Sequence, residues 1–410
     1  MAYIGKMFIA GSESHNGIYK CGISYSLSAP PPCSYVYDLK DGGWQVEFTE
    51  GAKDVVARTK QSIPYDLLHI EGFSAVQEAL DVMSVKGISS ISLGDPASSN
   101  VGVYERNGKY ILFSYALIDF PMGIEMEVIQ TDSLGNVIEQ QKPLEPVWNE
   151  SFRYYRLSQS STDYFEAYRN LFLALEALLN SLFPKNKSEG EGAWLKRSLS
   201  EVNKKVSLRY FTPTGKEDPV EYIIKTQYKD VRCQLQHAKF PNSQLPHSSL
   251  TPIKVKNAYS NLVAIWMQIA GDYYNVPMEG GIITNTGFYS VLDGVFNKGV
   301  DVYFSPDNTK PSGGDVEVSP ILDKVFKLDS SKYIGQVSPG IVRVIASEEL
   351  KASDSSYERY IHRICSGYSG EINSVCYIES GLMISGVDIW ESIQDFRLVN
   401  TCKPKVEFKT

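Results

Sequence analysis

An arginine and a histidine five positions apart are the residues of this chain with the clearest capacity for chemistry. Arg232 and His237 stand in the stretch Tyr228–Lys239. A guanidinium group stays charged and donates a fork of hydrogen bonds that fits phosphate or carboxylate oxygens. An imidazole titrates near neutral pH, so it can remove or return a proton. Together the two side chains combine anion binding with proton transfer.

A capped helix is predicted to carry this pair. Asp218 can cap its start, Pro219 suits the first helical position, and Glu221 completes a capping box. The helix is expected to continue to about Lys239, ahead of Pro241.

The rotation of residues around this helix predicts different surroundings for the two side chains. Its buried stripe consists of Ile224, Tyr228, Val231 and Leu235. At about 100° per residue, Arg232 falls at the edge of that stripe. His237 falls almost opposite it and shares a face with Cys233. We therefore expect His237 to face solvent or a second subunit rather than the interior of its own bundle.

Three further helices are predicted around it. An apolar stripe with spacings of three and four residues follows Asp163 and ends before Pro184. A shorter helix is expected around Trp194–Val206, and a long one from Thr251 to about Tyr274. Four helices joined by loops predict a compact bundle over residues 149–277.

Lysine and arginine are concentrated around the helix of Arg232. Between Trp194 and Lys256 there are twelve Lys and Arg against five Asp and Glu, a balance of +7. The net charge of the whole chain is −8, which leaves −15 for the remainder. A basic region of this kind can attract phosphate groups, although an ordinary solvated bundle can carry the same charge.

Both ends of the chain have the pattern of β-strands. Short runs rich in Tyr, Ile, Val and Phe are bounded by Gly, Pro, Asn and Asp over residues 1–148 and again over 278–410. Asn107-Gly108 predicts a tight hairpin turn, and Phe73–Val85 has the composition of a helix. The expected fold class is α+β, with a central all-α four-helix bundle flanked by an N-terminal and a C-terminal β-rich domain.

Several protein classes are disfavoured by what the sequence lacks. The six cysteines include no C-x-x-C pair, and no phosphate-binding loop, dinucleotide fingerprint, zinc-protease motif or nucleophile elbow is present. We therefore expect no metal and no cofactor. The apolar runs are too short to span a membrane, and the N-terminus does not resemble a signal peptide, so a cytoplasmic protein with no membrane partner is expected.

The segment from Tyr228 to Lys239 resembles the R-x4-6-H helix of the HEPN superfamily, in its four-residue spacing. The helix that follows Asp163 and the long helix from Thr251 resemble other helices of that fold, so the resemblance covers about 125 residues. Many HEPN members carry Asn, Asp or His directly after the arginine, where this chain has Cys233.

The resemblance implies metal-independent RNA cleavage by an endoribonuclease whose two motifs face each other in a homodimer. RNA supplies its own nucleophile, the 2′-hydroxyl, so the protein needs only proton transfer and charge stabilisation. His237 would be the general acid/base and Arg232 the phosphate stabiliser. Lys229, Cys233, Gln236 and Lys239 are candidate RNA-binding residues of the same helix. The implied setting is a toxin or anti-phage abortive-infection effector, in which the β-rich segments sense a trigger or bind a partner protein.

Two alternatives remain open at this point. The helices could form a non-catalytic HEPN module that binds nucleotide or RNA, or that dimerises, with Arg232 and His237 in structural roles. Alternatively, the chain could be an adaptor that acts through its β-rich segments.

Overall fold

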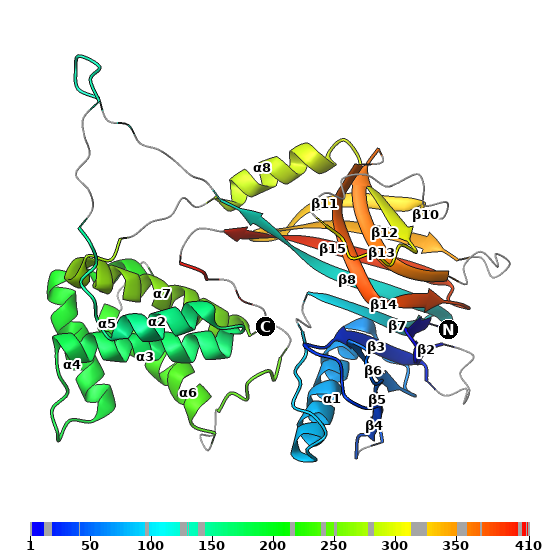
Figure 1. The fold of residues 1–410 in the computed structure, drawn as a ribbon, viewed down its shortest axis with the longest axis horizontal. Coiled ribbons are helices and arrows are strands. Elements are labelled where there is room, and N and C mark those ends of the chain that lie inside the picture. Colours follow the sequence, from blue (N-terminus) through cyan, green and yellow to red (C-terminus); the bar gives the residue numbers. More distant parts are fainter. Residues whose placement is uncertain are drawn as a thin grey trace. The chain divides into compact units, whose positions relative to one another are not determined.

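The computed structural model of this chain comprises two compact units (Figure 1). The sheet unit comprises Met1–Pro121 and Thr284–Val399, and the helical unit comprises Met122–Ile283 and Asn400–Thr410. The residues described are 2–11, 19–40, 42–94, 98–123, 129, 131–137, 144–213, 218–238, 243–249, 252–277, 283–312, 326–350, 359–369, 371–400, 404–406 and 408.

The first sheet of the sheet unit joins strands from both ends of the chain. Its order is β10-β9-β13-β14-β1-β2. Strand β1 pairs antiparallel with β14, with Ala2 opposite Ile384, so the first residues of the chain lie beside a strand close to its end. The strands are β1 (Ala2–Ile4), β2 (Met7–Ala10), β9 (Asp301–Ser305), β10 (Phe326–Lys327), β13 (Arg359–Tyr368) and β14 (Glu371–Ile384).

The second sheet is also built from both ends. Its order is β11-β12-β15-β8-β7-β3-β6-β5-β4, in which β15 and β8 are the neighbours that join the two segments. Its strands are β3 (Cys21–Ser26), β4 (Tyr35–Asp38), β5 (Trp44–Phe48), β6 (Asp54–Thr59), β7 (Ser99–Arg106), β8 (Lys109–Met122), β11 (Ser330–Ser338), β12 (Ile341–Glu349) and β15 (Ile389–Asn400).

The predicted hairpin turn is confirmed. Asn107 and Gly108 both have positive φ, 56° and 75°, and Arg106 pairs with Lys109 across the turn. Two residues with positive φ match the right-handed twist of the flanking strands, β7 and β8.

Helices α1 and α8 pack in the described part of the sheet unit. Helix α1 (Tyr65–Val85) begins earlier than the sequence predicted and contacts β3, β5 and β6. Gly72 lets it approach the sheet, because a Cβ atom there would lie 2.4 Å from a methyl carbon of Ile23. Helix α8 (Asn285–Phe296) places Phe296 against the ring of Phe396, with 5.2 Å between ring centroids.

The expected fold class, a central four-helix bundle between two separate β-rich domains, is wrong. The two β-rich segments are not independent, because β1 pairs with β14 and β8 lies beside β15. A strand's apolar pattern shows which face is buried but not which distant strand supplies its hydrogen bonds, so the sequence did not reveal that these segments share their sheets.

The helical unit contains more helical segments than the sequence predicted. Helix α2 (Ser151–Ser160), which was not expected, packs against α3 and stacks Tyr155 on Trp266, with 4.2 Å between ring centroids. The other elements are α3 (Tyr164–Leu182), α4 (Glu191–Lys205), the 3₁₀ turn η1 (Leu208–Phe211), α5 (Pro219–Ile223), η2 (Ile224–Arg232), α6 (Cys233–Gln236) and α7 (Ile253–Tyr274).

Two of the predicted helix starts are confirmed. The Asp163 carboxylate accepts hydrogen bonds from the backbone of Phe165 and Glu166, which caps α3. The Asp218 carboxylate does the same for Val220 and Glu221, ahead of α5. Each cap satisfies backbone N–H groups that have no partner within the helix.

The core of the helical unit lies between α3 and α7 and takes in one residue from the end of the chain. Phe408 packs edge-on against Tyr164 and Tyr259, with 5.5 and 4.9 Å between ring centroids. In the part of the chain that the structure describes, no helix is long and apolar enough to cross a membrane.

Candidate functional site in the helical unit

The helix that carries Arg232 is wound in an unusual way. It starts as the short helix α5, becomes a π-helix over η2 (Ile224–Arg232), and returns to α-helix in α6. A π-helix has backbone hydrogen bonds between residues five apart, and π-turns within helices occur frequently at functional sites. The helix ends at Gln236, before the predicted end at Lys239, which itself lies outside the described residues.

A buried tyrosine on α3 holds this π-helical segment. The hydroxyl of Tyr168 donates to the backbone carbonyl of Gln227 at 2.6 Å and lies 3.2 Å from the side-chain oxygen of the same residue. Both residues are almost fully buried. The hydroxyl therefore satisfies polar groups in the middle of η2 that would otherwise be costly to bury.

Arg232 lies between two carboxylates from neighbouring helices. Its Nη2 atom is 3.4 Å from an oxygen of Glu176 on α3 and also forms an ion pair with Glu191, the first residue of α4. The Arg232 side chain is only 12% exposed. Its Nε atom is buried and has no hydrogen-bond partner, so one donor of the guanidinium group remains unused.

Aromatic rings border the guanidinium group. The Arg232 Cζ atom lies 5.8 Å from the ring centroid of Phe172 and 5.5 Å from that of Tyr228. These are cation–π distances, and such contacts fix the position of a guanidinium group while they exclude water from its faces.

Glu176 has the properties of a proton-transfer group. Burial, together with a hydrogen bond to Glu191, raises the pKa of its carboxyl to about 7 against the opposing effect of Arg232. At neutral pH both protonation states of Glu176 are therefore populated. A carboxyl group of this kind beside an arginine is a common feature of catalytic sites, although buried ion-pair networks with a structural role also produce it.

The other predicted site residues that the structure describes lie on the same helix or directly after it. His237 is half-buried and directly follows α6, and its backbone N–H donates to the carbonyl of Cys233 at 3.1 Å. Cys233 is also half-buried, while Lys229 and Gln236 are exposed. Arg169 of α3 reaches the carbonyl of Leu235 at 3.4 Å, which stabilises the helix end ahead of His237.

Sequence reasoning missed the two carboxylates. Glu176 interrupts an apolar run of α3, and a charged residue at an otherwise buried position is a signal that it has a partner. Glu191 fell in an expected loop, because the helix that it begins was predicted to start near Trp194. Nothing in the spacing of the sequence connects either residue to Arg232.

No three His, Cys, Asp or Glu side chains among the described residues form a group that could hold a metal ion. Comparisons with protein-family models, with curated proteins and with solved structures find no match for this chain.

Proposed function

We propose that the helical unit is a metal-independent endoribonuclease of HEPN type, with Arg232 and His237 as its catalytic residues. The observation that carries the proposal is the position of Arg232 on a π-helical turn beside Glu176, because a carboxyl group with a pKa of about 7 is partly protonated at neutral pH and can give up the guanidinium group to a phosphate. The excess of Lys and Arg over Asp and Glu in the region around this helix would also attract the negatively charged RNA backbone.

The reaction would need no group beyond the RNA and these side chains. The 2′-oxygen of RNA forms a bond to the adjacent phosphorus, and the bond between phosphorus and the 5′-oxygen breaks. One proton leaves the 2′-hydroxyl, and another is delivered to the departing 5′-oxygen. His237 performs these transfers in the proposal, and Arg232 stabilises the charge that develops on the phosphate oxygens.

Glu176 and Glu191 would control access to the arginine. Because both carboxylates contact Nη2, an incoming phosphate competes with them for the guanidinium group. Protonation of Glu176 lowers its attraction for the guanidinium group and favours the phosphate in this competition. His237 is half-buried at a helix end. The proposal includes a homodimer, in which a second copy of the chain brings its own Arg232 and His237 to the same RNA. We further propose that the protein acts as a toxin or an anti-phage effector.

A second candidate function is a non-catalytic helical module that binds RNA or dimerises. The observation in its favour is the same pair of ion contacts, since an arginine that joins α3, α4 and η2 can be retained for stability alone. Breaking a buried ion pair typically costs about 3–5 kcal/mol, which is sufficient to explain such a residue.

Cleavage of single-stranded RNA in the presence of a metal chelator distinguishes the two candidates. We expect the wild-type chain to cleave and the variants Arg232→Ala and His237→Ala to lose at least about 100-fold in rate, the contribution usual for a general acid or base. His237→Ala is the more informative change, because it removes no ion pair of Arg232.

Matched controls separate chemistry from folding. Arg209→Ala replaces an exposed arginine in the 3₁₀ turn η1 of the same basic region and should leave the rate within about twofold. The melting temperature of each variant is measured in parallel. If His237→Ala cleaves at the wild-type rate while it remains folded, the nuclease proposal is wrong and the non-catalytic module is favoured.

A further inference from the structure

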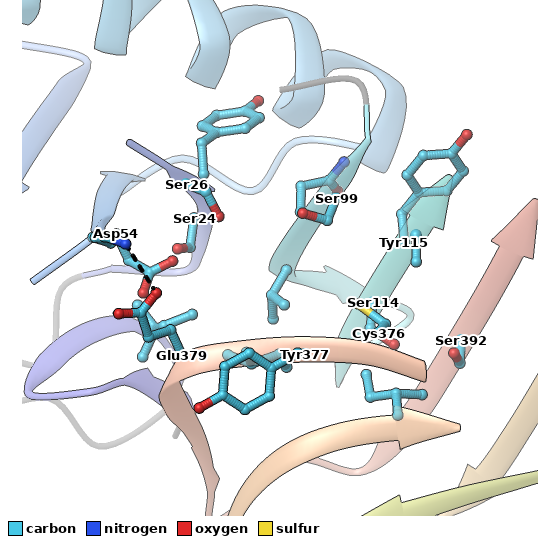
Figure 2. Close-up of a pocket in the computed structure, with 18 of the residues that line it drawn as sticks. Ser24, Ser26, Asp54, Ser99, Ser114, Tyr115, Cys376, Tyr377, Glu379 and Ser392 are labelled. Carbon is cyan, nitrogen blue, oxygen red and sulfur yellow. Dashed lines mark ion pairs between the residues drawn. The ribbon is translucent and has the colours of Figure 1, made fainter. Parts of the chain in front are cut away.

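The sheet unit contains a cavity of about 250 Å³ between its two sheets. Its floor is formed by neighbouring strands of the second sheet, β6, β3, β7, β8 and β15, and its opposite wall comes from β1, β13 and β14 (Figure 2). An engineered cavity of about 150 Å³ binds benzene, so this cavity has room for a molecule with one ring and short substituents.

Buried polar atoms without partners line this cavity. Ser24 and Gln394 are 2% and 1% exposed, and the Ser24 hydroxyl and the Gln394 Nε2 atom have no hydrogen-bond partner. Asp54 is 6% exposed, and its Oδ2 atom also lacks a partner. Unsatisfied polar atoms are costly to bury, so the three around this cavity are positions where a ligand or ordered water can complete the hydrogen bonds.

Asp54 and Ser24 mark one end of the cavity. They come from the paired strands β6 and β3, and Figure 2 places Ser392 toward the other end. Lys53 and Glu379, which form an ion pair of 3.4 Å, line the end near Asp54 with side chains that are 46% and 60% exposed. That end therefore meets solvent and offers a path for entry.

The charges at this end favour one class of ligand. Lys53 is neutralised by Glu379, so the Asp54 carboxylate determines the local charge, and an anionic ligand would meet repulsion. Burial raises the pKa of Asp54 to about 6, which leaves the carboxylate mainly ionised above neutral pH. A buried carboxylate with an unused oxygen is stabilised most by a cationic hydrogen-bond donor.

We infer that this cavity binds a small organic amine, with its protonated nitrogen between Asp54 and Ser24 and its apolar body between the two sheets. The walls beside the body are apolar and include Ile4, Val101 and Ile378. The unpaired Nε2 of Gln394 is a donor, so an acceptor group at the distant end of a longer amine would complete it. The inference does not depend on RNA cleavage by the helical unit.

Three probes of one skeleton test this inference by isothermal titration calorimetry above neutral pH. Tyramine carries an amine, tyrosol carries a hydroxyl at the same position, and 4-hydroxyphenylacetate carries a carboxylate. We expect tyramine to bind at least about tenfold more tightly than tyrosol, and the carboxylate to show no binding.

Variants then locate the bound amine. Asp54→Asn should weaken tyramine at least about tenfold and affect tyrosol less, because only the amine uses the charge. Ser24→Ala is a second, smaller change at the same end, and Asp119→Asn is the control, since Asp119 lies on β8 with a side chain that is 48% exposed. The inference is overturned if tyramine fails to bind at about 10 mM, if the carboxylate binds equally well, or if Asp54→Asn leaves tyramine binding unchanged.

Discussion

At the scale of single residues, the proposed chemistry of the helical unit depends on the ionisation of the two carboxylates that contact Arg232. When both Glu176 and Glu191 are ionised, the three side chains carry a net negative charge. When Glu176 holds a proton, they are neutral as a group. Because Glu176 titrates with a pKa of about 7, the availability of Arg232 to an anion changes with pH near neutrality.

The raised pKa of Glu176 also predicts how stability varies with pH. In the folded protein the Glu176 carboxyl retains its proton up to about pH 7. In the unfolded chain the same carboxyl loses its proton near pH 4.5. The folded state therefore binds more protons between these values, and its free energy of unfolding falls as the pH rises from about 4.5 to 7. Glu176→Gln should reduce this fall by up to about 3 kcal/mol, as measured by urea unfolding across that range.

Glu166→Gln is the matched control for this measurement. Glu166 lies on the same helix, α3, with a side chain that is 58% exposed. The control should keep the pH dependence of the wild-type chain. Identical pH dependence in Glu176→Gln and Glu166→Gln would show that Glu176 is not buried as described.

The sequence predicted which residues could do chemistry but not what surrounds them. Arg232 and His237 were found from their types and spacing; both were predicted to lie within the helix, whereas the structure places Arg232 in it and His237 directly after its end. The carboxylates that hold Arg232 are distant in sequence, and an ion pair between helices leaves no periodic pattern.

At the scale of elements, the π-helix η2 decides where Arg232 points. A π-turn has more residues per turn than an α-helix, so rotation angles worked out for an α-helix do not hold beyond Ile224. The sequence predicted the start of this helix through Asp218 and Pro219 but not its winding. Local propensities cannot predict such winding, because here a buried contact from another helix, the Tyr168 hydroxyl, supports it.

Removal of the Tyr168 hydroxyl should therefore weaken both the helix and the proposed activity. Tyr168→Phe leaves the Gln227 carbonyl and side-chain oxygen without this donor, and we expect a loss of about 1–3 kcal/mol in the free energy of unfolding. Chemical denaturation measures that loss, and the rate of RNA cleavage should fall although no proposed catalytic residue has changed.

Tyr155→Phe is the control for this substitution. Its ring stacks on Trp266 in the same unit, and the variant retains that contact. It should cost less than about 0.5 kcal/mol. If Tyr168→Phe is no more destabilising than this control, the hydroxyl does not support the π-helix.

At the scale of the whole molecule, the sheet unit joins segments that are distant in the chain. Asp395 of β15 shows this directly, because its carboxylate accepts two hydrogen bonds from Arg343 of β12, at 2.6 and 2.8 Å, and one from the hydroxyl of Tyr115 of β8 at 3.2 Å. The Asp395 side chain is 5% exposed. One buried carboxylate therefore connects strands from both segments.

This connection predicts that the two segments unfold together. Asp395→Ala should reduce the free energy of unfolding by about 3 kcal/mol, since it leaves Arg343 and Tyr115 without their partner. Fluorine NMR with 5-fluorotryptophan follows Trp44 on β5 and Trp390 on β15 in urea. Both signals should shift to a lower urea midpoint by the same amount.

Asp119→Ala provides the comparison, because its exposed ion pair with Arg397 should contribute about 1 kcal/mol or less. A change in the Trp390 signal alone after Asp395→Ala would mean that the two segments fold separately. The sequence indicated β-strands at both ends of the chain through short runs rich in Tyr, Ile, Val and Phe, and the Asn107-Gly108 turn fixed one hairpin. The pairing of β1 with β14 was not predictable, since it depends on complementary surfaces rather than on any local signal.

The chemistry of the RNA ends formed in the metal-free cleavage reaction tests whether Arg232 and His237 are the catalytic pair. Attack by the 2′-oxygen produces a 2′,3′-cyclic phosphate on one fragment and a 5′-hydroxyl on the other. We predict these ends for the wild-type chain in the presence of a chelator, together with their absence in His237→Ala. Fragments with 3′-hydroxyl ends, or cyclic ends that form equally fast in His237→Ala, would contradict the assignment of Arg232 and His237 as the catalytic pair.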